Sequence, residues 1–133
     1  MTINPDSTKP IYIQIAQWLE TEILSQRIKA HEKMYSQYQL ADMFNINPAT
    51  AAKGLKLLLD QEILYKKRGL GMFVTEKARD IILDKRKNET LVALIEELIA
   101  EAERLGMEEK ELLSTIQNIY RQRERGGTEH DRD

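Results

Sequence analysis

The side chains that could do chemistry in this 133-residue chain are hydrogen-bond donors and cations rather than nucleophiles. The segment NPATAAK carries an amide at Asn47, a hydroxyl at Thr50 and an ammonium group at Lys53. Lys53 lies one helical turn beyond Ala49, so both would face the same side of a helix. Thr50 could hydrogen-bond a phosphate or a base edge, Lys53 could reach guanine or a phosphate, and the Ala49 methyl could contact a thymine methyl.

A second group of cations precedes a glycine-containing turn. Lys66, Lys67 and Arg68 are consecutive and are followed by Gly69. Like charges crowded on a hairpin repel one another unless phosphates neutralise them. Arg68 at the tip would be placed to enter a minor groove, where the potential is most negative. The alternative is that these cations only make the surface soluble.

The residue types that usually support catalysis are scarce. The chain has no cysteine, its two histidines His31 and His130 are far apart, and no glycine loop of the phosphate-cradling kind is present. Glu97 and Glu101 are four residues apart and could share a metal ion, but no histidine accompanies them. A surface pair between Glu101 and Arg104 is the simpler interpretation. We therefore expect neither an enzyme nor a cofactor or metal.

We expect a cytoplasmic protein, because the sequence shows neither a membrane span nor a secretory signal. The net charge is −2, but residues 1–77 carry ten Lys or Arg and eight Asp or Glu, whereas residues 78–133 carry ten and fourteen. No segment approaches the roughly 18 uncharged apolar residues of a membrane span. The start of the chain, MTINPDSTKP, lacks the basic and apolar regions of a secretory signal. No membrane partner is expected.

The polar segments are positioned by helices with clear start signals. Apolar residues recur every four positions from Ile11 to Ile23, which predicts a first helix that begins at Pro10 and ends near Ser25. Ser36 and Gln39 have the spacing of a capping box, so a second helix begins there.

A third helix follows after a tight turn. Asn45 can adopt the left-handed conformation that ends the second helix, and Asn47 with Pro48 caps and begins the third. The free N–H groups at this start would favour an anion. Asn47 and Pro48 either cap the helix only, or cap it and also lie near a ligand.

Two short strands complete the N-terminal domain. Residues 63–67 and 72–75 are predicted to be two short strands, and the glycines between them favour a hairpin turn. Three helices and a two-stranded wing make a winged helix-turn-helix, here expected over residues 1–76 within a mainly α protein.

The remainder of the chain has the pattern of amphipathic helices. Helical signal runs from Glu76 to a stop at Gly106, and a last helix is expected from about Glu108 to Tyr120. Two such short helices bury little apolar surface alone, so we expect residues 77–122 to dimerise, with an intramolecular hairpin as the alternative. Residues 123–133 are expected to be a disordered tail. The expected dimer contacts are Ile82, Leu91, Leu94, Ile95, Leu98, Leu112, Ile116, Ile119 and Tyr120.

Residues 10–74 resemble the DNA-binding domain of the GntR family of bacterial transcription regulators. PIYIQIAQWLETEI is similar to the family's first helix, YSQYQLADMFNINPATAAKGLKLLLDQEIL to its helix-turn-helix, and YKKRGLGMFV to its wing. The short C-terminal part and the NPATAAK segment resemble the YtrA-like subfamily. The resemblance implies contacts with double-stranded operator DNA from Ser36, Tyr38, Asn47, Ala49, Thr50, Lys53, Lys66, Lys67, Arg68 and Gly69.

The chain departs from the family pattern in two places. In the polar connector between the first two helices, residues 26–33, the chain has Gln26, Ala30 and His31 where the family usually has Gly and Pro-Gly. The second helix opens with YSQY rather than Pro-Ser-Glu-Arg, so Tyr38 replaces an arginine that often contacts DNA. A phenolic hydroxyl can still donate a hydrogen bond to a phosphate, which predicts a weaker form of that contact.

A symmetric dimer would pair two recognition helices about one helical turn of DNA apart, roughly 34 Å, so the operator should be an inverted repeat. The resemblance further implies a repressor that controls a transporter operon. An unidentified small-molecule effector would have to bind between subunits, because about fifty C-terminal residues leave little room for a pocket. The rival interpretation is a winged-helix adaptor that contacts proteins and binds no DNA. Salt-dependent DNA retention would distinguish the two.

Overall fold

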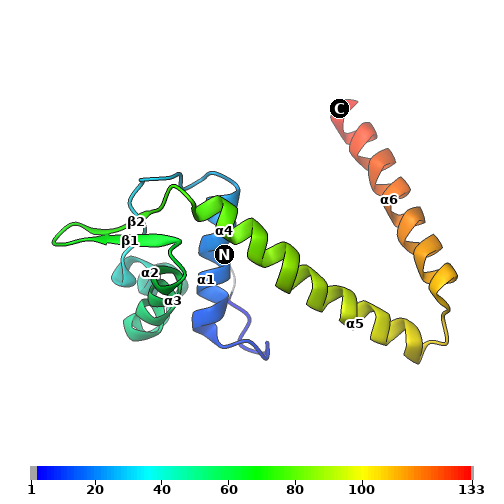
Figure 1. The fold of residues 1–133 in the computed structure, drawn as a ribbon, viewed down its shortest axis with the longest axis horizontal. Coiled ribbons are helices and arrows are strands. Elements are labelled where there is room, and N and C mark those ends of the chain that lie inside the picture. The colour runs from blue at the N-terminus through cyan, green and yellow to red at the C-terminus, as the bar shows by residue number, and fades with distance from the viewer. Residues whose placement is uncertain (1–2, 133) are drawn as a thin grey trace. The chain divides into compact units, whose positions relative to one another are not determined.

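The fold was obtained as a computed structural model that describes the backbone of residues 3–132 and the side chains of residues 3–126. The chain divides into two units, Met1–Lys87 and Asn88–Asp133. Both are mainly helical, and the two-stranded sheet belongs to the first (Figure 1). No helix among the described residues is long and apolar enough to cross a membrane.

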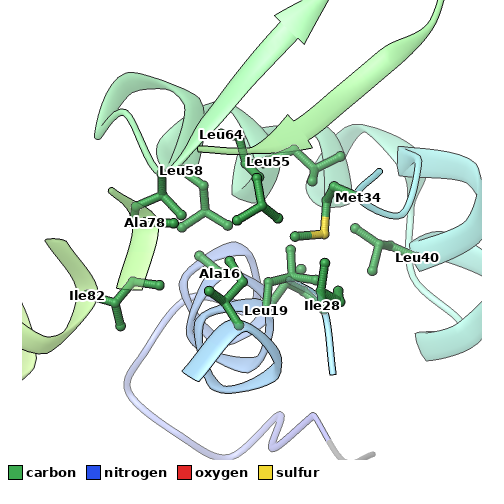
Figure 2. Packing of buried hydrophobic residues seen from close by; sticks show 14 of the residues in the cluster. Ala16, Leu19, Ile28, Met34, Leu40, Leu55, Leu58, Leu64, Ala78 and Ile82 are labelled. Carbon is green, nitrogen blue, oxygen red and sulfur yellow. The ribbon is translucent and has the colours of Figure 1, made fainter. Parts of the chain in front are cut away.

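The first helix, α1 (Ile11–Leu24), forms the centre of the first unit. Pro10 is its N-cap rather than its first residue, and Ser25 is its C-cap. The four-residue spacing predicted a buried face, and Ile15, Leu19 and Ile23 are buried there. Side chains from α3, the wing and α4 pack around this face (Figure 2).

Helices α2 (Gln37–Phe44) and α3 (Pro48–Asp60) pack against each other as the helix-turn-helix. The predicted capping box is present, because the Ser36 hydroxyl accepts from the Gln39 N–H and the Gln39 side chain accepts from the Ser36 N–H. Asn45 ends α2 in the left-handed conformation, with φ of 54°. These local signals determine where α3 begins.

The wing consists of β1 (Leu64–Lys67) and β2 (Gly71–Val74), antiparallel with Leu64 opposite Val74. The connector between α1 and α2 also pairs with the wing, because the Met34 N–H donates to the Met72 carbonyl oxygen at 2.8 Å. Gln26 and His31 have positive φ values of 62° and 67°. The connector thus adopts left-handed conformations without the glycines that such positions favour.

Helix α4 (Ala78–Lys85) extends the first compact unit beyond the end predicted for the winged helix-turn-helix. We expected residues 1–76 to form this domain, but α4 packs on α1 and the first unit continues to Lys87. Ile82, predicted as a dimer contact, is completely buried in this core. The prediction for Ile82 is wrong because α4 completes the intramolecular core and leaves that side chain no surface for a second subunit.

The second unit contains α5 (Leu91–Arg104) and α6 (Glu109–Arg132), preceded by a π-helical turn, η1 (Arg86–Thr90). Gly106, with φ of 71°, follows the end of α5 as predicted, and the Met107 N–H donates to the Ala102 carbonyl oxygen. Helix α6 extends past the predicted end near Tyr120 and includes most of the segment 123–133 that was expected to be disordered. Its residues 121–125, RQRER, are good helix formers, which accounts for the continuation as far as Arg125.

Candidate nucleic-acid interface

The start of α3 is built by its cap. The Asn47 side-chain oxygen accepts from the Ala49 N–H at 2.8 Å, and the Asn47 carbonyl accepts from Thr50 at 3.0 Å and Ala51 at 3.2 Å. These N–H groups therefore have partners within the chain, contrary to the expectation that they would be free for an anion. Asn47 is a true cap, yet it is exposed and its amide nitrogen carries two further donor hydrogens.

One face of α3 is buried and the opposite face is open to solvent. Ala51, Leu55 and Leu58 lie in the core, whereas Ala49 and Lys53 are exposed. Thr50 lies at the border and is partly exposed. The polar surface predicted from the NPATAAK spacing is therefore present on the protein, in the N-terminal half of the helix.

Lys53 is held in place by an aromatic ring that the sequence analysis did not identify. Its Nζ lies 4.2 Å from the centre of the Tyr12 ring, a cation–π contact between α3 and α1. The contact depends on Gly54, because a Cβ there would lie 2.9 Å from the Tyr12 carbonyl oxygen. A glycine inside a helical pattern was the only sequence signal for this close approach.

The two predicted contacts on α2 differ in what they can offer. The Ser36 hydroxyl is occupied by the cap, since the Gln39 N–H donates to it at 3.1 Å. Tyr38 is 69% exposed in the first turn of the helix. The Tyr38 hydroxyl can therefore donate to a phosphate, in line with the prediction for this position.

The wing presents its cations along an exposed hairpin. Lys66, Lys67 and Arg68 are all exposed, and the turn uses Gly69 with φ of 79°. The Lys67 Nζ lies 4.6 Å from the centre of the Phe73 ring, so this ammonium group rests on the aromatic face of the hairpin. Arg68 and Gly69 occupy the turn itself.

The connector stabilises the wing and adds a fourth cation. Lys33 forms an isolated bridge with Phe73, and its side chain passes beside Gly71. The His31 ring contacts the Tyr65 hydroxyl at 3.1 Å and the Glu76 carboxylate at 2.7 Å. Neither contact was predicted, because each joins residues more than thirty positions apart.

In the first unit, α3 packs against both α2 and β1, and Figure 1 shows these elements on one side of the unit with α4 on the other. Neighbouring elements therefore carry the exposed start of α3 with Lys53, the Tyr38 side chain on α2 and the cations of the wing. Sequence predicted each group separately, and the packing brings their elements together.

The second unit carries a separate, apolar surface. On α5, Leu91, Leu94, Ile95 and Leu98 are exposed in the single chain. A groove of about 630 Å³ runs between α5 and α6 and is lined mainly by apolar side chains. Among the remaining predicted dimer contacts, Leu112 and Ile116 are partly buried. Ile119 and Tyr120 are exposed.

Comparison with known proteins agrees with this architecture. The chain is 31% identical over 117 residues to the HTH-type transcriptional repressor YtrA of Bacillus subtilis, covering 88% of this chain and 89% of the relative. A GntR family transcriptional regulator from Listeria monocytogenes shares 29% identity with a TM-score of 0.68, covering 85% of this chain and 97% of the other. AraR(DBD) in complex with operator ORX1 shares 26% identity with a TM-score of 0.51, covering 56% and 93%. No family model matches the chain.

A winged helix that exposes the start of its third helix beside a cationic hairpin is the architecture of a DNA-binding transcription regulator. The chain belongs to the GntR family of such regulators, in its YtrA-like branch.

Proposed function

We propose that this regulator is a repressor that binds an inverted-repeat operator as a homodimer. The observation that carries the proposal is the exposed start of α3, with Ala49 and Lys53 open to solvent next to the cationic wing. In this arrangement α3 enters the major groove with its N-terminal half, and Arg68 reaches the adjacent minor groove. Asn47, Thr50 and Lys53 supply the base and phosphate contacts, and Ser36, Tyr38, Lys66, Lys67 and Gly69 border the phosphates.

Dimerisation is supported by the apolar face of α5. Leu94, Ile95 and Leu98 are each more than 40% exposed, which is unusual for three large apolar side chains on one helix of a monomer. Packing against the same face of a second chain would bury them and fill the groove beside α6. A two-fold axis would place two copies of α3 about 34 Å apart, one turn of DNA.

The repressor role is supported by the relatives named as repressors, YtrA among them. Control of a transporter operon rests on the resemblance to YtrA-like regulators, and a chain that binds bacterial operators acts in the cytoplasm. In the proposed dimer the apolar groove of the second unit is occupied by partner side chains, so a small effector would bind where the two subunits meet.

Selection of bound sequences from random double-stranded DNA tests the proposal. We expect the selected sequences to share a two-fold symmetric motif with half-sites about one helical turn apart. A single unrepeated motif would exclude the dimeric mode. Recovery of no enriched sequence would exclude operator recognition and favour an adaptor.

The salt dependence of binding gives an independent check. Fluorescence anisotropy on the selected operator should show affinity falling steeply between 50 and 200 mM salt, by about 10³-fold or more for six or more phosphate contacts. A protein-binding adaptor would retain no DNA even at the lowest salt concentration.

A further inference from the structure

A buried carboxylate lies outside the surface that faces DNA. Glu20 on α1 is 1% exposed, and its two oxygens contact Lys85 and Arg86 at the end of α4. The Arg86 Nη2 lies 3.3 Å from the Glu20 Oε1. Lys85 also donates to the Gln61 side-chain oxygen at 3.2 Å, so three segments of the first unit meet at one charge.

The hydrogen bonds of this cluster fix the orientation of its side chains, which apolar packing does not do. Arg86 donates to the Gln17 carbonyl oxygen at 2.8 Å and to the Thr21 hydroxyl at 3.1 Å, in addition to Glu20. A guanidinium with that many partners is fixed in both position and orientation. Apolar replacements for a buried ion pair often give equal or greater stability, so stability alone does not account for this cluster.

The cluster joins the C-terminal end of α3 to the C-terminal end of α4, and these two ends have different roles in the proposed function. Gln61 is the C-cap of the recognition helix α3. Arg86 is the C-cap of α4 and the first residue of η1, and the first unit ends at Lys87. Through Lys85, Glu20 therefore connects the end of the helix proposed to read DNA with the point where the chain leaves the winged-helix unit.

We propose that Glu20 is a positioning residue for operator recognition. It fixes the direction in which the chain leaves the first unit relative to α3, and in a dimer it thereby sets the spacing of half-sites that two recognition helices can read together. This inference rests on the proposed function, because spacing has a meaning only for a dimer on an inverted repeat.

Two variants separate positioning from folding. Glu20→Gln keeps the side-chain shape but leaves Lys85 and Arg86 without their counter-charge. The double variant Glu20→Leu/Lys85→Met replaces the Glu20–Lys85 ion pair with apolar side chains. Arg86 keeps its hydrogen bonds to the Gln17 carbonyl oxygen and the Thr21 hydroxyl in this variant, so it provides a second test if the single variant does not fold. Glu22→Gln is the matched control, because Glu22 is also buried on α1 but pairs with Arg27 rather than α4.

The first measurement compares operators whose half-sites are moved apart or together by one base pair. The parent and Glu22→Gln should bind altered spacings about tenfold or more weakly than the original. For Glu20→Leu/Lys85→Met we expect this preference to fall below about threefold, with affinity for a single half-site unchanged. Equal spacing selectivity in the double variant and the parent would overturn the link between Glu20 and operator spacing.

The second measurement needs no DNA. The chain lacks cysteine, so spin labels can be placed at Lys56→Cys on α3 and Lys87→Cys beyond the cluster, both exposed sites. In dimers diluted with unlabelled chain, the distance distribution between the labels should be narrow in the parent and in Glu22→Gln, and clearly broader in both Glu20 variants. An unchanged distribution would overturn the positioning role. If the parent bound no operator, the proposed function would fail, while this measurement would still decide what Glu20 does.

Discussion

At the residue scale, the proposed recognition of DNA depends on side chains that are exposed but restricted in position. Lys53 is exposed, but the Tyr12 ring restricts where its ammonium group lies. Lys67 rests on Phe73 in a similar way. A long side chain that is partly ordered before binding loses less rotamer freedom when it meets DNA. In the proposed complex, the aromatic partners would thus contribute to DNA binding without touching DNA.

Lys53→Ala should weaken binding to the selected operator by about 1–3 kcal/mol, because a base contact is lost. Lys56→Ala is the matched control, since Lys56 is exposed on the same helix but lies one turn further from its start and pairs with Asp60 at 3.0 Å. Fluorescence anisotropy at fixed salt measures both. Equal losses in the two variants would mean that the start of α3 has no special role.

Arg68→Ala should weaken operator binding by about 1–3 kcal/mol if the side chain reads the minor groove, and by less if it only neutralises a phosphate. Removal of a phosphate contact should also lower the salt slope by about 1. Lys77→Ala, an exposed cation outside the wing, serves as the control. Arg68→Ala with the parental affinity and the parental slope would contradict the role of the wing.

At the element scale, the close packing of α3 on α1 decides where the recognition surface lies. Gly54 permits this approach, because any larger residue would bring its Cβ against the Tyr12 backbone. The connector and the hairpin also pack closely. Main-chain hydrogen bonds between residues 31–34 and the wing give the two-stranded sheet a third pairing partner. A hairpin alone is only marginally stable, so this pairing orders the wing.

Gly54→Ala should therefore destabilise the protein, although alanine is the better helix former. The added methyl group would lie 2.9 Å from a backbone oxygen, and overpacking of this kind costs typically about 1–3 kcal/mol. Thermal unfolding followed by circular dichroism measures the change, with Lys56→Ala as the exposed control on α3. A Gly54→Ala melting temperature equal to or above the parental value would show that α1 can move away at little cost.

At the scale of the whole molecule, the two units differ in how much of their apolar surface they bury within one chain. The first has its own core of apolar side chains from α1 to α4. In the second, of the side chains that the structure describes, only Ala102 is buried, and large apolar residues stay exposed. A unit that leaves so much apolar surface in water is more stable when it packs against another chain.

Leu94→Glu/Leu98→Glu should convert the dimer to a monomer, because carboxylates would be placed where an apolar interface is proposed. Sedimentation equilibrium at micromolar concentration measures the state, and anisotropy should show loss of preference for the inverted repeat over one half-site. Ala93→Glu adds a carboxylate on the opposite side of α5 and should remain dimeric. A parent that sediments as a monomer would support the alternative of an intramolecular helical hairpin.

Much of the local structure was predictable from the sequence, because its determinants lie within a few residues of one another. The Ser36–Gln39 capping box, the left-handed Asn45 and the turn at Gly69 were all expected and are present. The exposed face of α3 could be predicted for the same reason, since helical periodicity alone places Ala49 and Lys53 opposite the apolar residues.

Only the tertiary structure decided the rest, because it depends on contacts between distant segments. Ile82 belongs to an amphipathic pattern whose apolar side could have faced a partner, but α4 packs it against α1. Glu20 and Arg86 are 66 residues apart, and no local rule relates them. Sequence periodicity shows which face of a helix is apolar, whereas the packing of the whole chain determines what covers that face.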